Sequence, residues 1–256
     1  MKQYITFLKK EITENLRGGK MLLIFAVFVI FGIMNPAIAK LTPLMIESLK
    51  DALSESGMQI TEVTVNALTS WTQFFKNIPM AMIIFAIAYS SVITSEYSHG
   101  TLVLNVSRGL SKNKIILAKL PVVLIIWTLG YYISFGITYL ASDILWDNSI
   151  AFYINEAVFC QWLFGIFIIA LIFFFSALFK NAILVILGTG APILFFTFIG
   201  LFPKLARFIP TALMNSGNLL TGAEKISYYT PSIMVTAILS LVLIAASFPI
   251  INNKEL

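Results

Sequence analysis

Six long apolar stretches dominate this sequence, and none of them contains Asp, Glu, Lys, Arg or His. A helix needs about 20 mostly apolar residues to cross the hydrocarbon core of a bilayer. Each stretch is therefore predicted to be a transmembrane helix, and the fold class is predicted to be an all-α integral membrane protein. The predicted spans are 21–39, 78–95, 120–142, 157–179, 182–202 and 231–251. They leave no room for a second, soluble domain, so residues 1–256 are predicted to form a single transmembrane domain.

The composition supports this class. Hydrophobic residues make up 59% of the chain and charged residues 11%, whereas soluble domains are about half apolar and about a quarter charged. This balance excludes a soluble enzyme, a nucleic-acid-binding domain and a disordered chain. The single cysteine, Cys160, excludes an internal disulfide and a CxxC site.

The distribution of basic residues predicts the orientation. With six spans both termini lie on the same side of the membrane, and 11 Lys and Arg residues fall on that side against six on the other. Cytoplasmic connections carry the excess of Lys and Arg, so both termini and the segment 96–119 are predicted to be cytoplasmic. The connections 40–77 and 203–230 are then extracellular. We expect a multi-pass protein of a bacterial cell (plasma) membrane.

An alternative is that the first apolar stretch is a cleaved signal peptide, since it ends in Ala37-Ile38-Ala39. The basic leader is long and amphipathic, and the apolar run is longer than a signal peptide requires. Both features favour a retained transmembrane helix.

Residues 2–17 have the pattern of an amphipathic helix. The apolar residues Ile5, Leu8, Ile12 and Leu16 recur at spacings of three and four, and charged residues occupy the other face. This pattern predicts an interfacial helix on the inner leaflet, which Gly18-Gly19 separates from the first span. The alternative is a frayed cytoplasmic tail.

The segment 96–119, EYSHGTLVLNVSRGLSKNKIILAK, is more apolar than a simple connection needs to be. Leu102, Leu104, Val106 and Leu110 stand next to four cations, which predicts a small amphipathic element that docks a partner protein or the lipid surface. The alternative is a bend at the inner leaflet without a partner.

This segment resembles the permease subunits of ABC type-two exporters, in which a Glu after the second span is followed by Gly-Thr-Leu, a turn and a Lys before the third span. Glu96, Gly100, Thr101, Leu102, Ser111 and Lys119 match that pattern. The amphipathic leader and the six-span layout extend the resemblance over essentially the whole chain. The sequence departs from it at Gly109, where the turn proline would stand, and at Lys112, which replaces the usual Arg.

The resemblance implies that the leader helix and the segment after the second span form the docking surface for an ATPase subunit. The residues assigned to ATPase docking and coupling are Glu96, His99, Gly100, Thr101, Leu102, Arg108, Ser111, Lys112 and Lys114. It also implies a second permease subunit, a further copy or a paralogue, with ATP and Mg bound on the ATPase.

No catalytic or cofactor site is predicted in this chain. The phosphate-loop pattern GxxxxGK[ST] is absent, and Gly18-Gly19-Lys20 lacks its upstream glycine. The spans carry none of the ionisable residues that ion-coupled carriers and proton relays need. His99 is predicted to be a loop residue, no HExxH or GxSxG motif occurs, and no metal site is expected.

Aromatic residues recur every four positions on the third span, at Trp127, Tyr131, Phe135 and Tyr139. They form one stripe on a helix, which predicts either a substrate path or packing and lipid-facing surface. On the fifth span Gly188, Gly190 and Pro192 predict either a hinge or a close-packing patch.

Helical patterns also occur outside the spans. Two helix-like runs, 43–56 and 61–77, are predicted in the first extracellular connection. The second carries apolar residues at helical spacing around Pro210. The resemblance implies a short re-entrant helix there, and a plain surface helix is the alternative.

The predicted function is that of the membrane-spanning subunit of an ATP-driven exporter. Two permease subunits would form the path for a hydrophobic or amphipathic substrate, such as a peptide, drug or lipid, that moves outward. The alternative is a non-transporting membrane anchor or sensor that recruits a cytoplasmic partner.

Overall fold

The computed structural model describes residues 2–55, 64–98, 100–101, 107 and 111–254, and this part of the chain is helical with no strand. Six of its helices are long and apolar enough to cross a membrane, which confirms the predicted number of spans. They are α2 (Lys20–Glu55), α3 (Ala67–Tyr89), α6 (Lys112–Trp146), α7 (Ile154–Leu178), α8 (Ala182–Ile199) and α10 (Ile226–Asn253). The shorter elements are α1 (Lys2–Arg17), α4 (Thr94–Ser98), η1 (Asn148–Ile150), α9 (Pro203–Ala206) and η2 (Pro210–Thr221).

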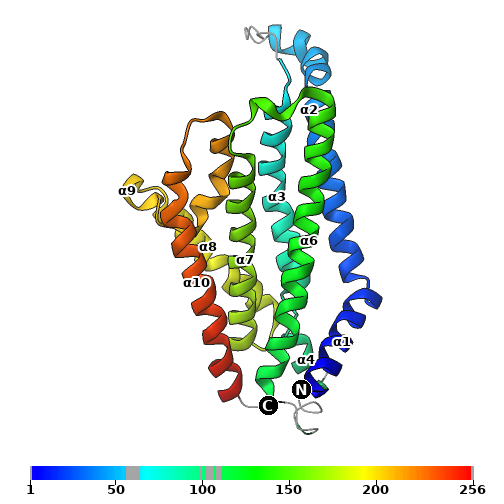
Figure 1. Cartoon of the computed structure of the whole chain (residues 1–256), viewed down its shortest axis with the longest axis vertical. Helices are drawn as coiled ribbons and strands as arrows, with labels where there is room; N and C mark the ends of the chain where they lie inside the picture. The colour runs from blue at the N-terminus through cyan, green and yellow to red at the C-terminus, as the bar shows by residue number, and fades with distance from the viewer. Residues whose placement is uncertain (1, 56–63, 99, 102–106, 108–110, 255–256) are drawn as a thin grey trace.

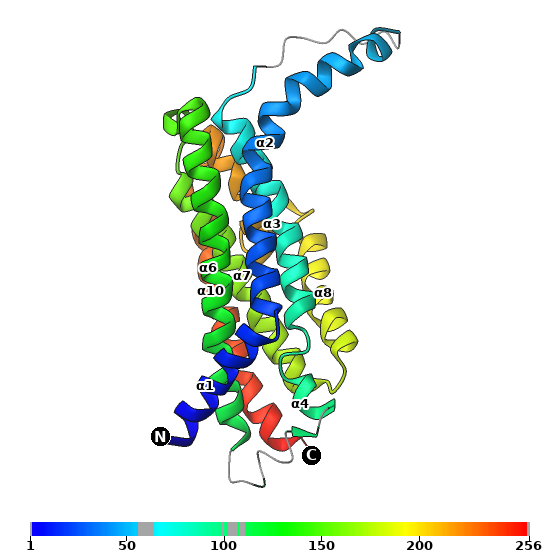
Figure 2. The ribbon, with the colours of Figure 1, turned by 90° about the vertical axis from the view of Figure 1, so that its right-hand side faces the viewer.

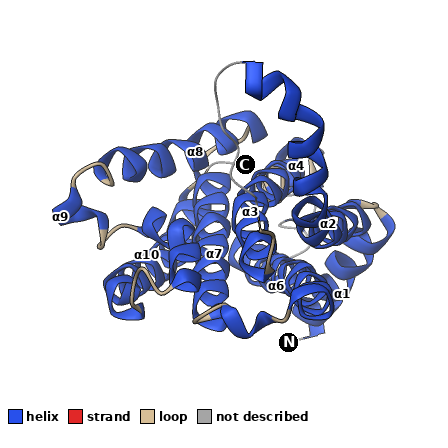
Figure 3. Cartoon of the chain, turned by 90° about the horizontal axis from the view of Figure 1, so that it is seen from above, coloured by secondary structure: helices blue, strands red, loops and turns tan. Residues whose placement is uncertain are grey.

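The helices form an elongated bundle whose two termini lie at the same end (Figure 1). Seen along the bundle, α3 and α7 lie inside, α1 and α2 lie on one side, and α8 and α10 lie on the other (Figure 3). Helix α7 packs against α3, α6, α8, α10 and η2, while α2 packs against α3 and α6. In α8, by contrast, only Val185 and Thr189 are buried.

Small residues allow the helices to approach closely. A Cβ atom added at Gly165 of α7 would lie 2.0 Å from the Trp127 ring of α6, and one at Gly130 of α6 would lie 2.5 Å from the Phe28 ring of α2. Two of the largest buried side chains therefore fit only because glycine stands opposite them. This kind of small-residue contact drives helix association in membranes, where burial from water does not.

Buried polar groups inside the bundle form hydrogen bonds between spans. Asn35 of α2 donates to the Thr138 hydroxyl at 2.9 Å and accepts from Asn77 of α3 at 2.8 Å, and Thr138 also donates to the Gly32 carbonyl. These contacts link α2, α3 and α6 without any charge.

At the end of the bundle opposite the two termini, which we call the outer end, two predicted boundaries are wrong. The run predicted over 43–56 is not a separate helix, because α2 continues without a break from Lys20 through Pro43 to Glu55, and its outer part leans away from the bundle (Figure 2). Of the run predicted over 61–77, residues 61–63 lie outside the described residues, residues 64–66 are not helical, and 67–77 form the first turns of α3. Asn66 caps this helix: its side chain accepts from the Thr69 amide, and the Thr69 hydroxyl accepts from the Asn66 amide.

The segment between the last two spans is packed into the bundle. It divides into α9 and the 12-residue 3₁₀ element η2, which contacts α3, α7, α8 and α10. Leu213, Ser216 and Leu219 are fully buried, and the Ser216 hydroxyl donates to the Ala157 carbonyl of α7 at 2.9 Å. A plain surface helix would not be enclosed in this way. Figure 1 shows that α8 stops below the outer ends of the neighbouring helices and that η2 lies above it.

Candidate functional site

A buried ion-paired cluster joins three elements at the end of the bundle where both termini lie. Lys119 of α6 places its Nζ atom 2.8 Å from Oε2 of Glu11 in α1 and 3.1 Å from Oε1 of Glu96 in α4. The exposed fractions are 4% for Lys119, 3% for Glu11 and 4% for Glu96. We call Glu11, Glu96 and Lys119 the junction.

The chain folds back after α4 to hold Glu96 in place. The Thr101 hydroxyl donates to the Glu96 carboxylate and lies 3.4 Å from the Glu96 carbonyl oxygen. Gly100 makes this return possible because its φ of +66° lies in the left-handed region that favours glycine. Three residues of the predicted docking segment, Glu96, Gly100 and Thr101, are thus brought together.

Helix α1 is attached to the bundle by a stripe of every fourth residue. Phe7 packs against Ile115 and Ala118 of α6, Glu11 binds Lys119, and Asn15 accepts a hydrogen bond from the Tyr89 hydroxyl at 3.2 Å. This stripe faces the protein.

The four apolar residues of α1 that are predicted to face the membrane differ in their exposure. Ile5, Ile12 and Leu16 are 58%, 45% and 56% exposed, so their side chains are free to contact lipid. Leu8 is half-buried and packs on the protein. Glu11 lies on the charged face of the predicted helix, but the structure buries it, because Lys119 supplies a counter-charge inside the bundle.

The junction holds two carboxylates and one ammonium group. The second oxygen of Glu11, Oε1, is buried and has no hydrogen-bond partner. Burial raises the pKa of the Glu11 carboxyl, and the attraction of Lys119 offsets part of that rise. Removing one member of such a cluster leaves an uncompensated buried charge. Separation of α1 or α4 from α6 would therefore cost free energy.

The remaining docking residues are distributed as follows. His99, Leu102 and Arg108 lie outside the described residues. Ser111 is the N-cap of α6, and Lys112 and Lys114 lie in its first turn. The Lys112 ammonium is used within the chain, because it donates to the backbone carbonyls of Lys254 at 2.6 Å and Asn252 at 3.3 Å.

The aromatic stripe of α6 divides into two parts. Trp127 and Tyr131 are 1% and 0% exposed, and they donate to the carbonyls of Trp162 and Val158 in α7. These two residues therefore pack the core of the chain.

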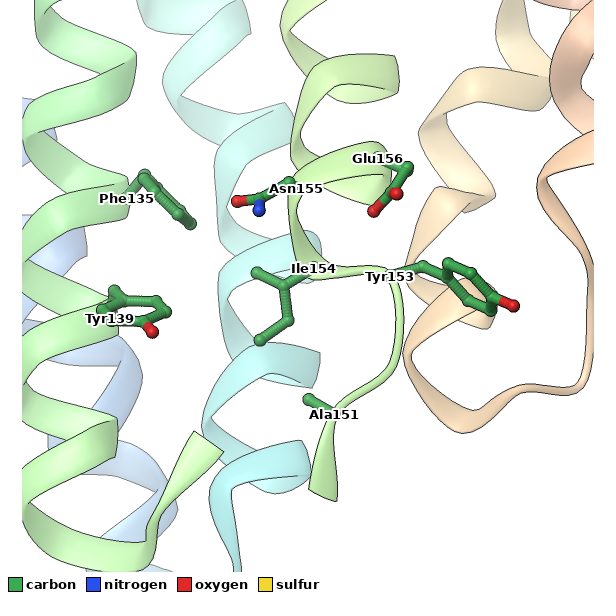
Figure 4. Close-up of a pocket in the computed structure, with 7 residues that line it drawn as sticks. All are labelled: Phe135, Tyr139, Ala151, Tyr153, Ile154, Asn155 and Glu156. Carbon is green, nitrogen blue, oxygen red and sulfur yellow. The ribbon is translucent and has the colours of Figure 1, made fainter. Parts of the chain in front are cut away.

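Phe135 and Tyr139 lie further out and line an open cavity of about 430 Å³. Their rings face Ile154 and Asn155 at the start of α7 (Figure 4). Of the four aromatic residues in the stripe, Phe135 and Tyr139 are therefore the two that a substrate could contact.

The glycines of α8 also differ. A Cβ at Gly188 would lie 2.7 Å from the Phe175 ring, so Gly188 serves close packing against α7. Gly190 has open space beside it and lines, with residues of α3 and α7, an apolar cavity of about 290 Å³. Helix α8 runs without a break through Pro192. The described residues contain no group of three His, Cys, Asp or Glu side chains that could hold a metal ion.

Comparison with protein families places the chain in a known family over most of its length. The model of the family described as ABC-2 family transporter protein matches residues 5–250, which include the junction, five of the six long helices completely and α10 up to residue 250. Comparison with curated proteins finds no match.

Proposed function

This chain belongs to the ABC-2 transporter family, and we propose that it is the permease subunit of an ATP-driven exporter. The family and the six apolar helices make it a multi-pass membrane protein of the transport class. The ATP-driven export, the partner ATPase and the pairing with a second permease are the proposal.

The observation that carries the proposal is the junction. The segment predicted to dock an ATPase begins at Glu96, and Glu96 is ion-paired to a residue of the third span, which is in turn ion-paired to α1. A push on that segment would therefore move α6 and α1 with it. A membrane anchor that only recruits a partner has no need for such a rigid link to a transmembrane helix.

The energy source would be a separate subunit. ATP and Mg would bind on the ATPase, and its closure would push on residues 96–112 and rock the spans toward an outward-open state. This chain would have no catalytic site of its own. Gly18 and Gly19 form the break between α1 and α2, where Gly19 has a φ of +73°, and Lys20 begins α2.

The path would form between two permease subunits in the bilayer. Many apolar side chains on the outward faces of α8 and α10 are exposed in the single chain, among them Leu187, Leu194, Phe198, Ile238 and Leu241. Together with the six apolar stretches, which carry no Asp, Glu, Lys, Arg or His, they suit a hydrophobic or amphipathic substrate. Phe135 and Tyr139, beside the outer cavity, are the aromatic residues placed to contact it.

The test is co-expression of this chain with the ATP-binding-cassette protein encoded beside it. We expect the two to purify as a complex, and we expect a Lys112→Glu/Lys114→Glu variant to lower both assembly and ATP turnover. Two control variants are used. Lys112→Met removes the hydrogen bonds to Asn252 and Lys254 without reversing the charge, and it therefore shows how much of the effect comes from losing those bonds. Lys204→Glu/Lys225→Glu reverses two charges at the outer end. Unchanged assembly and turnover in the first variant would overturn the docking assignment.

A further inference from the structure

Three lysines from different parts of the chain gather at the cytoplasmic end of the bundle. Lys112 begins α6, Lys180 lies between α7 and α8, and Lys254 follows α10. The ammonium groups of Lys254 and Lys180 lie 4.5 Å and 5.7 Å from the centre of the Tyr97 ring in α4. We call Lys112, Lys180 and Lys254 the lysine cluster. Figure 2 shows α4 beside the C-terminal end of the chain.

Backbone carbonyls hold two of these lysines in position. The last carbonyls of a helix have no partner within it. Lys112 donates to the carbonyls of Asn252 and Lys254 at the end of α10, and Lys254 donates to the Ala177 carbonyl at the end of α7 at 3.0 Å. These contacts restrict the rotation of the Lys254 side chain and hold its ammonium group near Lys180.

Within the described part of the chain, no acidic side chain forms an ion pair with a member of the lysine cluster. The ion pairs Lys10–Glu14, Lys119–Glu11 and Lys119–Glu96 include none of its three lysines. Partial burial and the nearby Lys180 lower the pKa of Lys254 to about 8. Burial is the larger cause of this shift and the charge of Lys180 the smaller one, and an anion placed between the two ammonium groups would stabilise the charged form of both.

Lys180 and Lys254 are held close to the ends of membrane-spanning helices. Lys180 lies in a three-residue connection between Leu178 and Ala182, and Lys254 directly follows the last residue of α10, so neither can extend far from a helix end. Beside Lys180, the exposed fractions of Leu178, Ile183 and Leu187 are 45%, 65% and 62%. An anion at this site would thus have an apolar surface directly next to it, on the membrane side.

We propose that the lysine cluster binds the phosphate of an anionic phospholipid from the inner leaflet. Its phosphate oxygens bridge Lys180 and Lys254, and its acyl chains lie along the exposed face of α8. Basic pockets between transmembrane helices on the cytoplasmic side are suited to such headgroups. Since Tyr97 belongs to the same helix as Glu96, the bound lipid would also stabilise the position of α4. The binding itself does not depend on the exporter function.

The test is native mass spectrometry of the full-length chain, purified from mixed micelles that contain equal amounts of phosphatidylglycerol and phosphatidylcholine. We expect the wild-type chain to retain phosphatidylglycerol preferentially. Each lysine near an anionic surface contributes about a fivefold increase in affinity, so Lys180→Gln/Lys254→Gln should bind this lipid about 30-fold more weakly. Lys180→Arg/Lys254→Arg keeps both charges and should retain it. The matched control, Lys204→Gln/Lys225→Gln, removes two charges at the outer end and should behave like wild type.

Three results would overturn the proposal. The first is equal retention of the two lipids by the wild-type chain. The second is a loss of phosphatidylglycerol from Lys204→Gln/Lys225→Gln as large as that from Lys180→Gln/Lys254→Gln, which would show a general effect of charge. The third is a Lys180→Gln/Lys254→Gln variant that keeps phosphatidylglycerol but no longer purifies with the ATPase, because the cluster would then be a protein-docking surface.

Discussion

Replacing Lys119 by methionine should lower the free energy of unfolding by about 3–5 kcal/mol, the usual cost of removing one partner from a buried ion pair. The Lys119 ammonium lies within 2.8 Å and 3.1 Å of two carboxylates. Both glutamates are less exposed than 5%, so water cannot replace the lost charge. We therefore expect the upper part of this range, with α1 and α4 released from the bundle.

The loss should depend on pH. Burial already raises the pKa of Glu11, and removing Lys119 raises it further because the attraction of the ammonium is lost. A carboxyl whose folded-state pKa is raised stabilises the fold at low pH, and that contribution disappears as the pH rises through the pKa. The Lys119→Met variant should therefore be closer in stability to wild type at pH 5 than at pH 8.

The assay is unfolding by SDS titration in mixed micelles, followed by the fluorescence of buried Trp71 and Trp127. Lys9→Met, at an exposed position of α1, is the control and should change the free energy of unfolding by less than about 0.5 kcal/mol. The triple variant Glu11→Gln/Glu96→Gln/Lys119→Met should recover to within about 1 kcal/mol of wild type, because neutral replacement of a buried ion cluster is often neutral or stabilising.

Two results would refute this reasoning. A loss below about 1 kcal/mol in Lys119→Met at pH 8 would mean that the junction is hydrated or already open. A triple variant less stable than the single one would mean that the three side chains contribute through packing and not through charge.

Three further predictions concern the bundle. Gly165→Ala should cost about 1–3 kcal/mol because its Cβ would overlap the Trp127 ring, whereas Gly136→Ala, at an open position, should cost under about 1 kcal/mol; equal thermal shifts would contradict the packing. Trp127→Ala should lower the free energy of unfolding by about 3–5 kcal/mol. Tyr139→Ala should leave this free energy nearly unchanged and alter the rate of ATP-dependent substrate efflux. Asn35→Leu should cost about 1–2 kcal/mol in the SDS assay, because it breaks two interhelical hydrogen bonds, and a stabilised variant would show that the network is dispensable.

The features that the sequence could predict are local ones. The number of spans follows from the lengths of the uncharged runs, and the break between α1 and α2 follows from Gly18-Gly19. Glu96, Gly100 and Thr101 lie within six residues of one another in the sequence. The chain can turn between them because Gly100 adopts a left-handed φ.

The features that could not be predicted depend on long-range packing. The partner of Glu11 lies 108 positions away at Lys119, and no short spacing reveals that a charged residue of an amphipathic helix turns toward the bundle. A useful signal was the position of Glu11 midway between Phe7 and Asn15, at helical spacing. For the aromatic stripe, hydropathy cannot separate the core residue Tyr131 from the outer residue Tyr139, because lipid and protein interior are equally apolar.

The most direct test of the central claim is a distance measurement across the junction. Spin labels at Ser98 in α4 and at Ile144, an 83% exposed residue near the outer end of α6, report whether docking moves the third span. In the complex with the ATPase, trapping with a non-hydrolysable ATP analogue and Mg should shift the distance distribution in the wild-type chain. In Glu11→Gln/Glu96→Gln/Lys119→Met, the ATPase should still bind and the shift should be lost. An identical shift in both proteins would contradict the proposal that the junction transmits the motion.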